Sequence, residues 1–461
     1  MPDTICAIAT PPGIGSIGVI RISGPSAFSI VQKIFRPSNK EKHLHLETVT
    51  SHTIHHGEIV EPSSGQIVDE ALFLVMKGPH SYTGEDVIEI QSHGNPYLLQ
   101  KILSLLIASG ARLSQPGEFT RRAYLSGKID LSQAEAVMQV ITAESAAAQE
   151  MALHQLRGRL SKQVEMIQKE VLSILSEMEA SIDFVEQGIT LSKETSLTAK
   201  IDKIYQAIAH LLARYEEGKQ IQDGVTVVMV GRPNVGKSSI MNLLLGEDRA
   251  IVTTIPGTTR DTLEERITLS GRLIKIIDTA GIRSALDPIE LEGVKRGEAA
   301  LKKGDIALCI LDASVPLSAE DMELLDRTRS KKRILVLNKK DLPIKIETAV
   351  IEGKYPTDPI VHLSAITGAG QSDLQNKLTA LLQSFTTTKE MPLVSLLRHK
   401  NALVRAEVAL SRALGSVREQ ASVEFLASDL RDALDALGEI LGATTTDAIL
   451  DQIFNQFCIG K

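Results

Sequence analysis

The chain has 461 residues, of which 43% are hydrophobic and 23% are charged, and its formal net charge is −7. This length and composition indicate a globular protein of roughly three domains, and the negative charge argues against a nonspecific nucleic-acid binder. There is no Trp and only 3% of residues are aromatic, so few side chains are available to stack on unpaired bases.

The cysteine and hydropathy patterns favour the cytoplasm. Three cysteines (Cys6, Cys309 and Cys458) cannot form a disulfide framework, and none has the spacing of a zinc site. No apolar run is long enough to span a bilayer, and the first residues lack the basic-then-apolar pattern of a secretion signal. We therefore expect a cytoplasmic protein without a membrane partner.

The first part of the chain, residues 1–120, is expected to form an α/β domain. A helix is predicted over Pro96–Ser109, with Gly110 as its C-cap, and Pro116-Gly117-Glu118-Phe119 marks a boundary. Short apolar or alternating runs predict strands at Thr4–Thr10, Ser16–Ser23, Ala71–Met76 and Asp86–Ile90.

Two long stretches without proline are expected to be helical. None occurs between Pro116 and Pro233 or after Pro392, and proline is strongly disfavoured inside helices. Apolar residues in both stretches recur at steps of three or four, which favours a bundle core over a partner-binding face. They are Leu153, Leu156, Leu160, Val164, Ile167, Val171, Ile174, Met178 and Ile182, then Leu403, Leu410, Leu414, Val417, Leu426, Leu430, Leu434, Leu437 and Leu441. We predict one helical domain in two parts, 121–218 and 386–461, interrupted by an inserted α/β domain at 219–385.

The inserted domain opens with a phosphate-binding pattern. Gly231 to Ser239 matches G-x-x-x-x-G-K-[ST], follows the apolar run Val225–Val230 and precedes a helical pattern. The alternative is an ordinary glycine-rich turn. In the functional interpretation, main-chain N–H groups surround the phosphates, Lys237 reaches the β- and γ-phosphates, and the Ser238 hydroxyl ligates Mg²⁺.

Later strands in this domain predict a doubly wound, mostly parallel sheet with helices on both faces. Arg266–Leu269 and Leu273–Ile277 are expected to pair across Ser270-Gly271. Further strands are predicted at Ile306–Leu311, Ile334–Leu337 and Ile360–Leu363.

Three further motifs, each following a strand, are those expected of a GTP site. Asp278-Thr279-Ala280-Gly281 suits water-mediated Mg²⁺ binding and contact with the γ-phosphate. In Asn338-Lys339-Lys340-Asp341, the Asp341 carboxylate can accept two hydrogen bonds from guanine that adenine does not offer. Ser364-Ala365 supplies a main-chain N–H for the guanine O6. Four such motifs in order indicate a GTP-binding domain.

The catalytic apparatus is less conventional. Ile282 occupies the position where many GTPases have a water-orienting Gln. Several groups remain open as replacements, either for water orientation or for charge stabilisation. They are the acids Asp287, Glu290 and Glu292, the arginines Arg260 and Arg283, and a monovalent cation ligated by Asn234.

These residues resemble the MnmE (also called TrmE) family of bacterial-type tRNA-modification GTPases along the whole chain. The matching motifs are Ala9–Gly13, Arg21–Gly24, Thr83–Asp86, Pro116–Phe119, Lys128–Leu131, Gln133–Ala136, Gly257–Asp261 and the terminal Phe457-Cys458-Ile459-Gly460-Lys461. The resemblance implies the same three-part fold, with an N-terminal domain that forms a homodimer and binds a reduced folate of the 5-formyl- or methylene-tetrahydrofolate type. It also implies potassium-stimulated GTP hydrolysis. With an MnmG-type flavoprotein, forming a heterotetramer, such proteins add a carboxymethylaminomethyl-type group to carbon 5 of the tRNA wobble uridine.

The resemblance also assigns residues to each site. It implies Glu290 as the catalytic, water-orienting acid, with Ser238 and Thr259 on Mg²⁺. The potassium ligands would be Asn234, Thr253, Ile255 and Thr258, and the folate residues Arg21, Glu89, Lys128 and Lys461. The residues expected to bind GTP are Asn234, Val235, Gly236, Lys237, Ser238, Ser239, Thr253, Thr254, Ile255, Pro256, Gly257, Thr258, Thr259, Asp278, Thr279, Ala280, Gly281, Asn338, Lys339, Asp341, Ser364 and Ala365.

Two other functions stay open at this point. The first is a ribosome-assembly GTPase that binds rRNA, although such proteins usually carry a basic appendage and the tail after Pro392 is mixed in charge. The second is a stand-alone folate enzyme fused to a regulatory GTPase.

Overall fold

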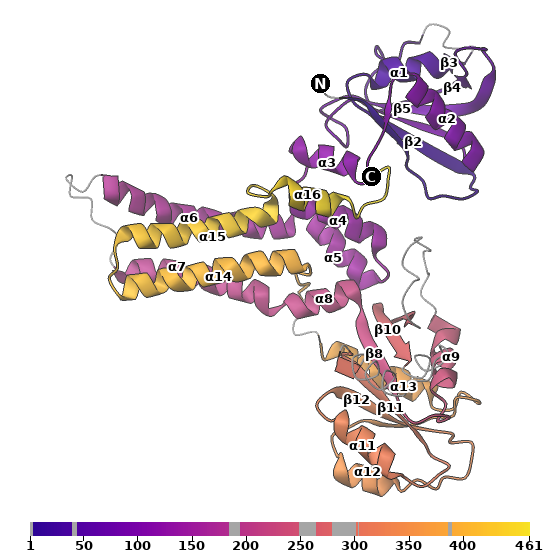
Figure 1. Cartoon of the computed structure of the whole chain (residues 1–461), viewed down its shortest axis with the longest axis vertical. Coiled ribbons are helices and arrows are strands. Elements are labelled where there is room, and N and C mark those ends of the chain that lie inside the picture. Colours follow the sequence, from indigo (N-terminus) through magenta and orange to yellow (C-terminus); the bar gives the residue numbers. More distant parts are fainter. Residues whose placement is uncertain are drawn as a thin grey trace, which may run out of the picture. The chain divides into compact units, whose positions relative to one another are not determined.

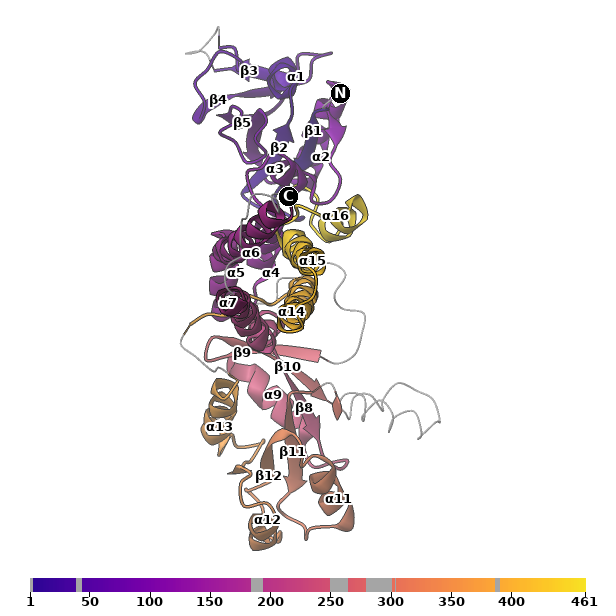
Figure 2. The ribbon, with the colours of Figure 1, turned by 90° about the vertical axis from the view of Figure 1, so that its left-hand side faces the viewer.

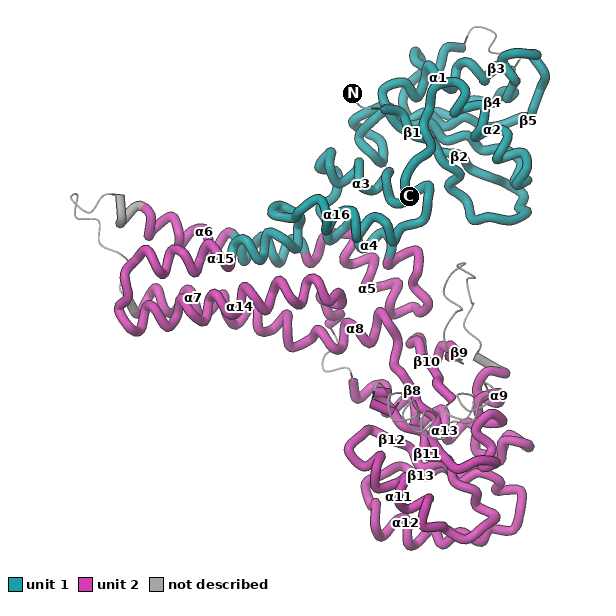
Figure 3. The backbone as a smooth tube through the Cα atoms, in the orientation of Figure 1, with its two compact units in different colours: residues 1–138, 161–168, 434–461 teal, residues 139–160, 169–433 magenta. Residues whose placement is uncertain are grey.

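The structure, a computed structural model, describes residues 3–38, 44–183, 194–248, 264–278, 301–302, 304–385 and 390–461. The chain divides into two compact units, coloured in Figure 3. Unit 1 comprises 1–138, 161–168 and 434–461, and unit 2 comprises 139–160 and 169–433. Each unit combines an α/β part with helices, and the four predicted domain ranges remain a prediction.

Unit 1 contains a seven-stranded sheet with the order β3-β4-β5-β6-β2-β1-β7. Its strands are β1 (Ile5–Ile8), β2 (Ile17–Ser23), β3 (Phe35–Pro37), β4 (Thr53–Val60), β5 (Ile67–Met76), β6 (Val87–His93) and β7 (Arg112–Leu113). All neighbours pair antiparallel except β1 and β7, which are parallel. The four predicted strands are therefore present, whereas β3, β4 and β7 were not predicted.

One face of this sheet is covered by α1 (Ala27–Ile34) and α2 (Pro96–Ala108), as Figure 1 shows. Alternate strand residues such as Phe73 and Ile90 are fully buried beneath these helices, as the twofold period of a strand requires. The predicted helix is confirmed as α2. It begins where the Asn95 side chain accepts hydrogen bonds from Tyr97 N and Leu98 N.

The two proline-free stretches are helical, as predicted. They form α3 (Glu118–Leu125), α4 (Leu131–Thr142), α5 (Ala146–Leu156), α6 (Arg159–Asp183), α7 (Glu194–Ala213), α8 (Tyr215–Asp223), α14 (Leu397–Arg418), α15 (Val423–Leu441) and α16 (Asp447–Phe454). The apolar stripe beginning at Leu153 is divided between two helices, because the chain turns at Gly158 with a φ of 74°. Among the described residues, no helix combines the length and apolar character needed to cross a membrane.

The segments of α6, α7, α14 and α15 that belong to unit 2 form a bundle, and Figures 1 and 2 show α7 and α14 side by side. Most of the predicted apolar stripe is buried in it, including Val171, Ile174, Leu403 and Leu410. Ion pairs between neighbouring helices lie on its surface, where each contributes little stability. They are Lys200–Glu177, Lys203–Glu170, Arg412–Asp429, Arg412–Asp432 and Arg431–Glu179.

The inserted region forms a six-stranded sheet with the order β13-β12-β11-β8-β10-β9. Its strands are β8 (Val225–Val230), β9 (Glu264–Leu269), β10 (Arg272–Asp278), β11 (Ile306–Asp312), β12 (Lys332–Asn338) and β13 (Ile360–His362). All pairs are parallel except β9 with β10. These two strands join through Ser270 and Gly271, whose φ values of 51° and 76° suit a tight hairpin turn.

Helices cover both faces of this sheet. They are α9 (Lys237–Asp248), α11 (Ala319–Arg327), α12 (Thr348–Lys354) and α13 (Gln371–Gln383). α9 and α13 pack on one buried cluster with Val227 and Met229, and α11 and α12 pack on another with Val228 and Val230. The predicted doubly wound sheet is confirmed.

The helical part and the inserted α/β part are in direct contact within unit 2. The β9–β10 hairpin lies against the start of α5, where Ala147 N donates to Gly271 O at 3.3 Å. Arg266 forms an ion pair with Glu144, and the Thr268 hydroxyl donates to Glu144 O at 3.4 Å.

A pair of helical glycines tests the close packing of α8. A Cβ on Gly218 would lie 2.2 Å from Val394 O, whereas a Cβ on Gly415 in α14 meets nothing within 4 Å. We expect Gly415→Ala to raise the free energy of unfolding by about 0.5–1 kcal/mol, the helix-propensity gain. Gly218→Ala should lower it by about 1–3 kcal/mol, because main chain cannot move aside as a side chain can.

The measurement is urea unfolding of the full chain followed by far-ultraviolet circular dichroism. Equal gains in stability for both variants would contradict the close approach at Gly218.

Candidate functional site: a nucleotide site and a second site at the chain end

The phosphate-binding loop runs from β8 into α9. Asn234 and Gly236 have φ values of 63° and 98°, so the main chain turns sharply before the helix begins at Lys237. Lys237 is only 5% exposed, and its Nζ donates to Gly231 O and Arg232 O at 2.8 Å each. The Lys237 side chain thus bonds back to the main chain at the start of its own loop. The N-terminus of α9 provides the partial positive charge that favours phosphate binding.

Asn338 joins three of the predicted nucleotide-binding segments. Its side-chain Nδ2 donates to Val235 O at 2.8 Å, and its Oδ1 accepts from Ala365 N at 3.1 Å. The residue is 2% exposed, so both ends of the buried amide are satisfied. A Cβ at Gly236 would lie 2.3 Å from Asn338 Nδ2, which explains why the loop has a glycine there.

The loop predicted to recognise the base follows β12. Asp341 is exposed, and its Oδ1 accepts a hydrogen bond from the buried Ser364 hydroxyl at 2.6 Å. Lys339 has a φ of 66° and donates its Nζ to Asp312 Oδ2 at 2.6 Å. Burial opposes ionisation of Asp312, but this hydrogen bond keeps its pKa below the usual value. Lys339 and Asp341 are therefore each held by a residue outside the loop.

The residues near the loop suit a magnesium ion. The Ser238 hydroxyl donates to Asp278 Oδ2 at 3.1 Å, so a hydroxyl and a carboxylate oxygen meet beside the phosphate-binding loop. Mg²⁺ prefers such oxygen ligands and usually takes only one or two from the protein, with phosphates and water completing the set. In the described part of the chain no cluster of three or more His, Cys, Asp or Glu is placed to hold a metal ion.

Several predicted site residues lie outside the described residues. They are Thr253, Thr254, Ile255, Pro256, Gly257, Thr258, Thr259, Thr279, Ala280, Gly281 and Glu290, and the open candidates Arg260, Arg283, Asp287 and Glu292. Their roles stay predictions. Asn234 in the loop and Ser239 in the first turn of α9 are exposed.

A second candidate site lies in unit 1, where the end of the chain meets the sheet. Arg21 on β2 and Glu89 on β6 are directly opposite in the sheet register. Arg21 donates Nε to Glu89 Oε1 at 2.8 Å and Nη1 to Gly460 O at 3.3 Å. The guanidinium also lies 5.5 Å from the ring centre of Tyr82, within cation–π range.

The last four residues are attached to the start of α3. Gly117 N donates to Cys458 O at 3.5 Å and Phe119 N donates to Lys461 O at 3.1 Å. Burial lowers the pKa of Lys461, and the nearby positive charge of Arg21 lowers it further. Three of the four predicted folate residues are thus close together. The fourth, Lys128, donates its Nζ to Pro79 O at 2.9 Å.

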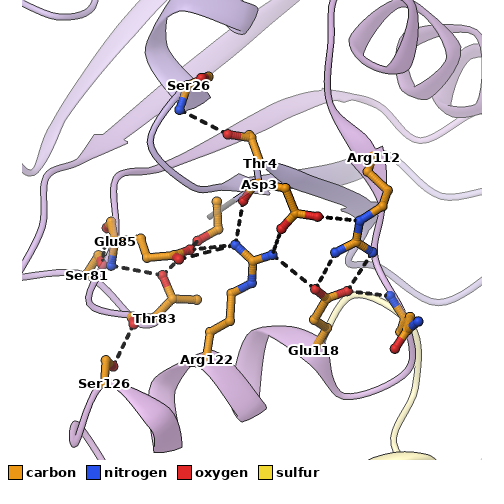
Figure 4. Close-up of polar contacts among 12 residues, drawn as sticks. Asp3, Thr4, Ser26, Ser81, Thr83, Glu85, Arg112, Glu118, Arg122 and Ser126 are labelled. Carbon is orange, nitrogen blue, oxygen red and sulfur yellow. Dashed lines mark hydrogen bonds and ion pairs between the residues drawn. The ribbon is translucent and has the colours of Figure 1, made fainter. Parts of the chain in front are cut away.

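A network of charged residues holds α3 in place (Figure 4). Arg122 contacts Asp3, Glu85 and Glu118, and Arg112 contacts Asp3 and Glu118. The hydrogen bond from Arg112 lowers the pKa of Asp3 to about 2. Burial opposes ionisation of Glu118, but its hydrogen bond with Arg112 keeps its pKa below the usual value. No role for Arg122 was predicted from the sequence. The only indication in the sequence was that two of its partners, Glu85 and Glu118, belong to motifs that match the family.

Comparison with known proteins identifies the family. Residues 4–128 match the model described as the GTP-binding protein TrmE N-terminus, and residues 131–458 match the model of the MnmE helical domain. A tRNA modification GTPase MnmE from Natranaerobius thermophilus is 42% identical over 461 residues, covering 100% of this chain and 99% of that protein.

A protein of the same name from Geotalea uraniireducens is 43% identical over 464 residues, covering 100% and 99% of the two chains. The crystal structure of the G domain of the T. maritima FeoB iron transporter is similar over 34% of this chain and 97% of that one, at 26% identity and a TM-score of 0.27. The full-length likeness to the MnmE proteins confirms the resemblance predicted from the sequence. The chain belongs to the MnmE (TrmE) family of tRNA modification GTPases.

Proposed function

We propose that this protein hydrolyses GTP to drive modification of the tRNA wobble uridine. The observation that carries the proposal is the meeting of three loops at the carboxyl ends of β8, β12 and β13, joined by the buried Asn338 amide. Loops at this edge of a parallel sheet form the usual ligand site of such folds. Asp341, oriented by Ser364, provides the guanine-specific carboxylate.

The same proposal includes the groups that the chain would bind for hydrolysis. Ser238 and Asp278 are suited to hold Mg²⁺, which neutralises charge on the phosphate oxygens. Asn234 would contribute to a potassium site with Thr253, Ile255 and Thr258, and the ion would stabilise charge that an arginine stabilises in other GTPases. Glu290 would orient the attacking water, because Ile282 has no hydrogen-bonding side chain.

In unit 1 we propose the folate site of the homodimer. Glu89 offers a carboxylate acceptor and Arg21 a guanidinium donor at the same point, a pair that suits a heterocycle with both donors and acceptors. The open sheet face nearby exposes apolar residues, including Ile54 and Leu72, which suits contact with a second copy. A flavoprotein of the MnmG type would act with this homodimer on tRNA in the cytoplasm, adding a carboxymethylaminomethyl-type group with the use of a folate one-carbon unit.

Guanine selectivity should depend on Asp341. We expect Asp341→Asn to weaken GTP binding by roughly 10- to 100-fold, because a charged acceptor facing two donors is lost. The variant should bind xanthosine triphosphate better than GTP, since xanthine presents an acceptor where guanine has an amino group.

The measurement is titration calorimetry with both nucleotides. Asp373→Asn is the matched control, because Asp373 is paired with Lys377 on the surface of α13 and should affect neither affinity. Unchanged GTP affinity in Asp341→Asn would remove the assignment.

Hydrolysis should require potassium rather than sodium. We expect faster GTP turnover in potassium chloride than in sodium chloride at matched ionic strength, because an oxygen cage selects ions by size. Asn234→Gly should abolish the difference while keeping most nucleotide affinity. Glycine is the informative replacement because it tolerates the φ of 63° at this position and removes only the amide. Equal turnover of the unaltered protein in both salts would exclude the potassium mechanism.

The last four residues should be needed for modification but not for nucleotide binding. We expect a variant that lacks residues 458–461 to give no wobble modification when it is the only copy of this protein in a deletion strain. Its affinity for GTP should be unchanged. Lys461→Met is the second variant, because it retains the main-chain contact with Phe119 and removes only the ammonium group. Mass spectrometry of tRNA nucleosides measures the outcome, and full modification by both variants would show that the tail has no such role.

A further inference from the structure

An ion pair connects a variable position of the phosphate-binding motif, Arg232, to α11, which lies outside the four GTP motifs. Arg232, the second residue of the loop, donates its Nε to Asp321 Oδ1 at 2.9 Å. Asp321 is 3% exposed, whereas the Arg232 side chain is 29% exposed. Neither residue is among those expected to bind GTP.

The two oxygens of Asp321 serve different partners. Oδ2 accepts from Ser318 N at 3.0 Å, and Ser318 Oγ in turn accepts from Asp321 N at 3.2 Å; these two bonds form the capping box at the start of α11. The Ser318 hydroxyl also donates to Oδ2 at 2.7 Å. Oδ1 accepts from Arg232. The capping box uses Oδ2 and not Oδ1, so the bond from Oδ1 to the loop is additional to the stabilisation of the helix start.

The loop on the other side of this bond has little freedom. A Cβ on Gly231 would lie 2.4 Å from Ile310 O, so the main chain there rests directly on β11. Arg232 is held by Asp321 one residue later. The carbonyl oxygens of these same two residues, Gly231 and Arg232, accept the hydrogen bonds of Lys237 Nζ. The position of the phosphate-binding lysine therefore depends on main chain that Asp321 helps to hold.

We propose that Asp321 is a positioning residue for nucleotide binding, acting through Arg232 on the phosphate-binding loop. The inference rests on the proposed GTP-binding function. GDP and GTP both use this loop, so both affinities should depend on Asp321 to the same extent. The preference for guanine over xanthine should not depend on Asp321, because Asp341, on another loop, is the residue proposed to contact the base.

A purely structural ion pair predicts a different result. An ion pair that acts only on folding contributes to the free energy of unfolding, and the contribution is small when one partner is partly exposed. Its loss would therefore lower the melting temperature slightly and leave the nucleotide affinity of the folded protein unchanged. Binding affinity measured well below the melting temperature separates the two roles.

The test is a double-mutant cycle with Arg232→Gln, Asp321→Asn and the double variant. Asparagine keeps one acceptor oxygen, so it cannot serve both the helix cap and Arg232. We expect each single variant to raise the Kd for GDP and for a nonhydrolysable GTP analogue by roughly tenfold, and the double variant to raise it no further. The GTP-to-xanthosine-triphosphate preference should stay unchanged in all three.

Ser318→Ala is the matched control. It removes the hydroxyl of the capping box and leaves both carboxylate oxygens of Asp321, so it should lower the melting temperature while the Kd stays within about twofold. Unchanged affinity in Asp321→Asn, independent effects of the two substitutions, or equal weakening by Ser318→Ala would each overturn the proposal. If the unaltered protein bound no guanine nucleotide, both the proposed function and the role of Asp321 would fail. If the unaltered protein bound guanine nucleotides normally and the variants bound them equally well, only the role of Asp321 would be removed.

Discussion

The nucleotide site depends on one buried amide, that of Asn338. Its two ends bond to Val235 O and Ala365 N, so the loops that follow β8 and β13 are held at a fixed distance from the loop that follows β12. A buried amide with either bond missing would leave a polar group unsatisfied, which is costly in an apolar interior. The same packing excludes any side chain at Gly236. The loops predicted to bind the phosphates and the base are therefore joined directly through one side chain.

Residues outside the GTP motifs complete that arrangement. Asp312 at the end of β11 holds Lys339, and Asp321 at the start of α11 holds Arg232. The two acids lie at the ends of one segment, residues 312–321, which runs from the end of β11, the strand next to β8, into α11. This segment thus contacts the base loop and the phosphate loop at once. A motif search looks for the groups that touch the ligand, and it does not find the groups that hold them.

In unit 1, the last residues of the chain are likewise held in place by residues distant in the sequence. The tail is held by main-chain hydrogen bonds to the start of α3 and by the bond from Arg21 to Gly460 O. α3 is in turn anchored by the ion pairs of Arg122 with Asp3 and Glu85. Because several charges share these contacts, the entropy lost in ordering each side chain serves more than one interaction. The position of the tail is therefore set by residues far from it in the sequence.

The sequence alone determined the fold class, the helical nature of both proline-free stretches and the strands of the inserted sheet. These features depend on local patterns, namely apolar periodicity, proline placement and the order of strand, loop and helix. The strands β3 and β4 and the break at Gly158 escaped prediction, because a short strand or a turn within an apolar stripe is decided by its neighbours in space. Likewise, the motifs were sufficient to recognise Asp278, Asn338 and Asp341. The sequence around Asp321 and Arg122, in contrast, does not indicate which residues they contact. Only the tertiary structure brings Asp321 to Arg232 and Arg122 to Asp3, since each contact joins segments about a hundred residues apart.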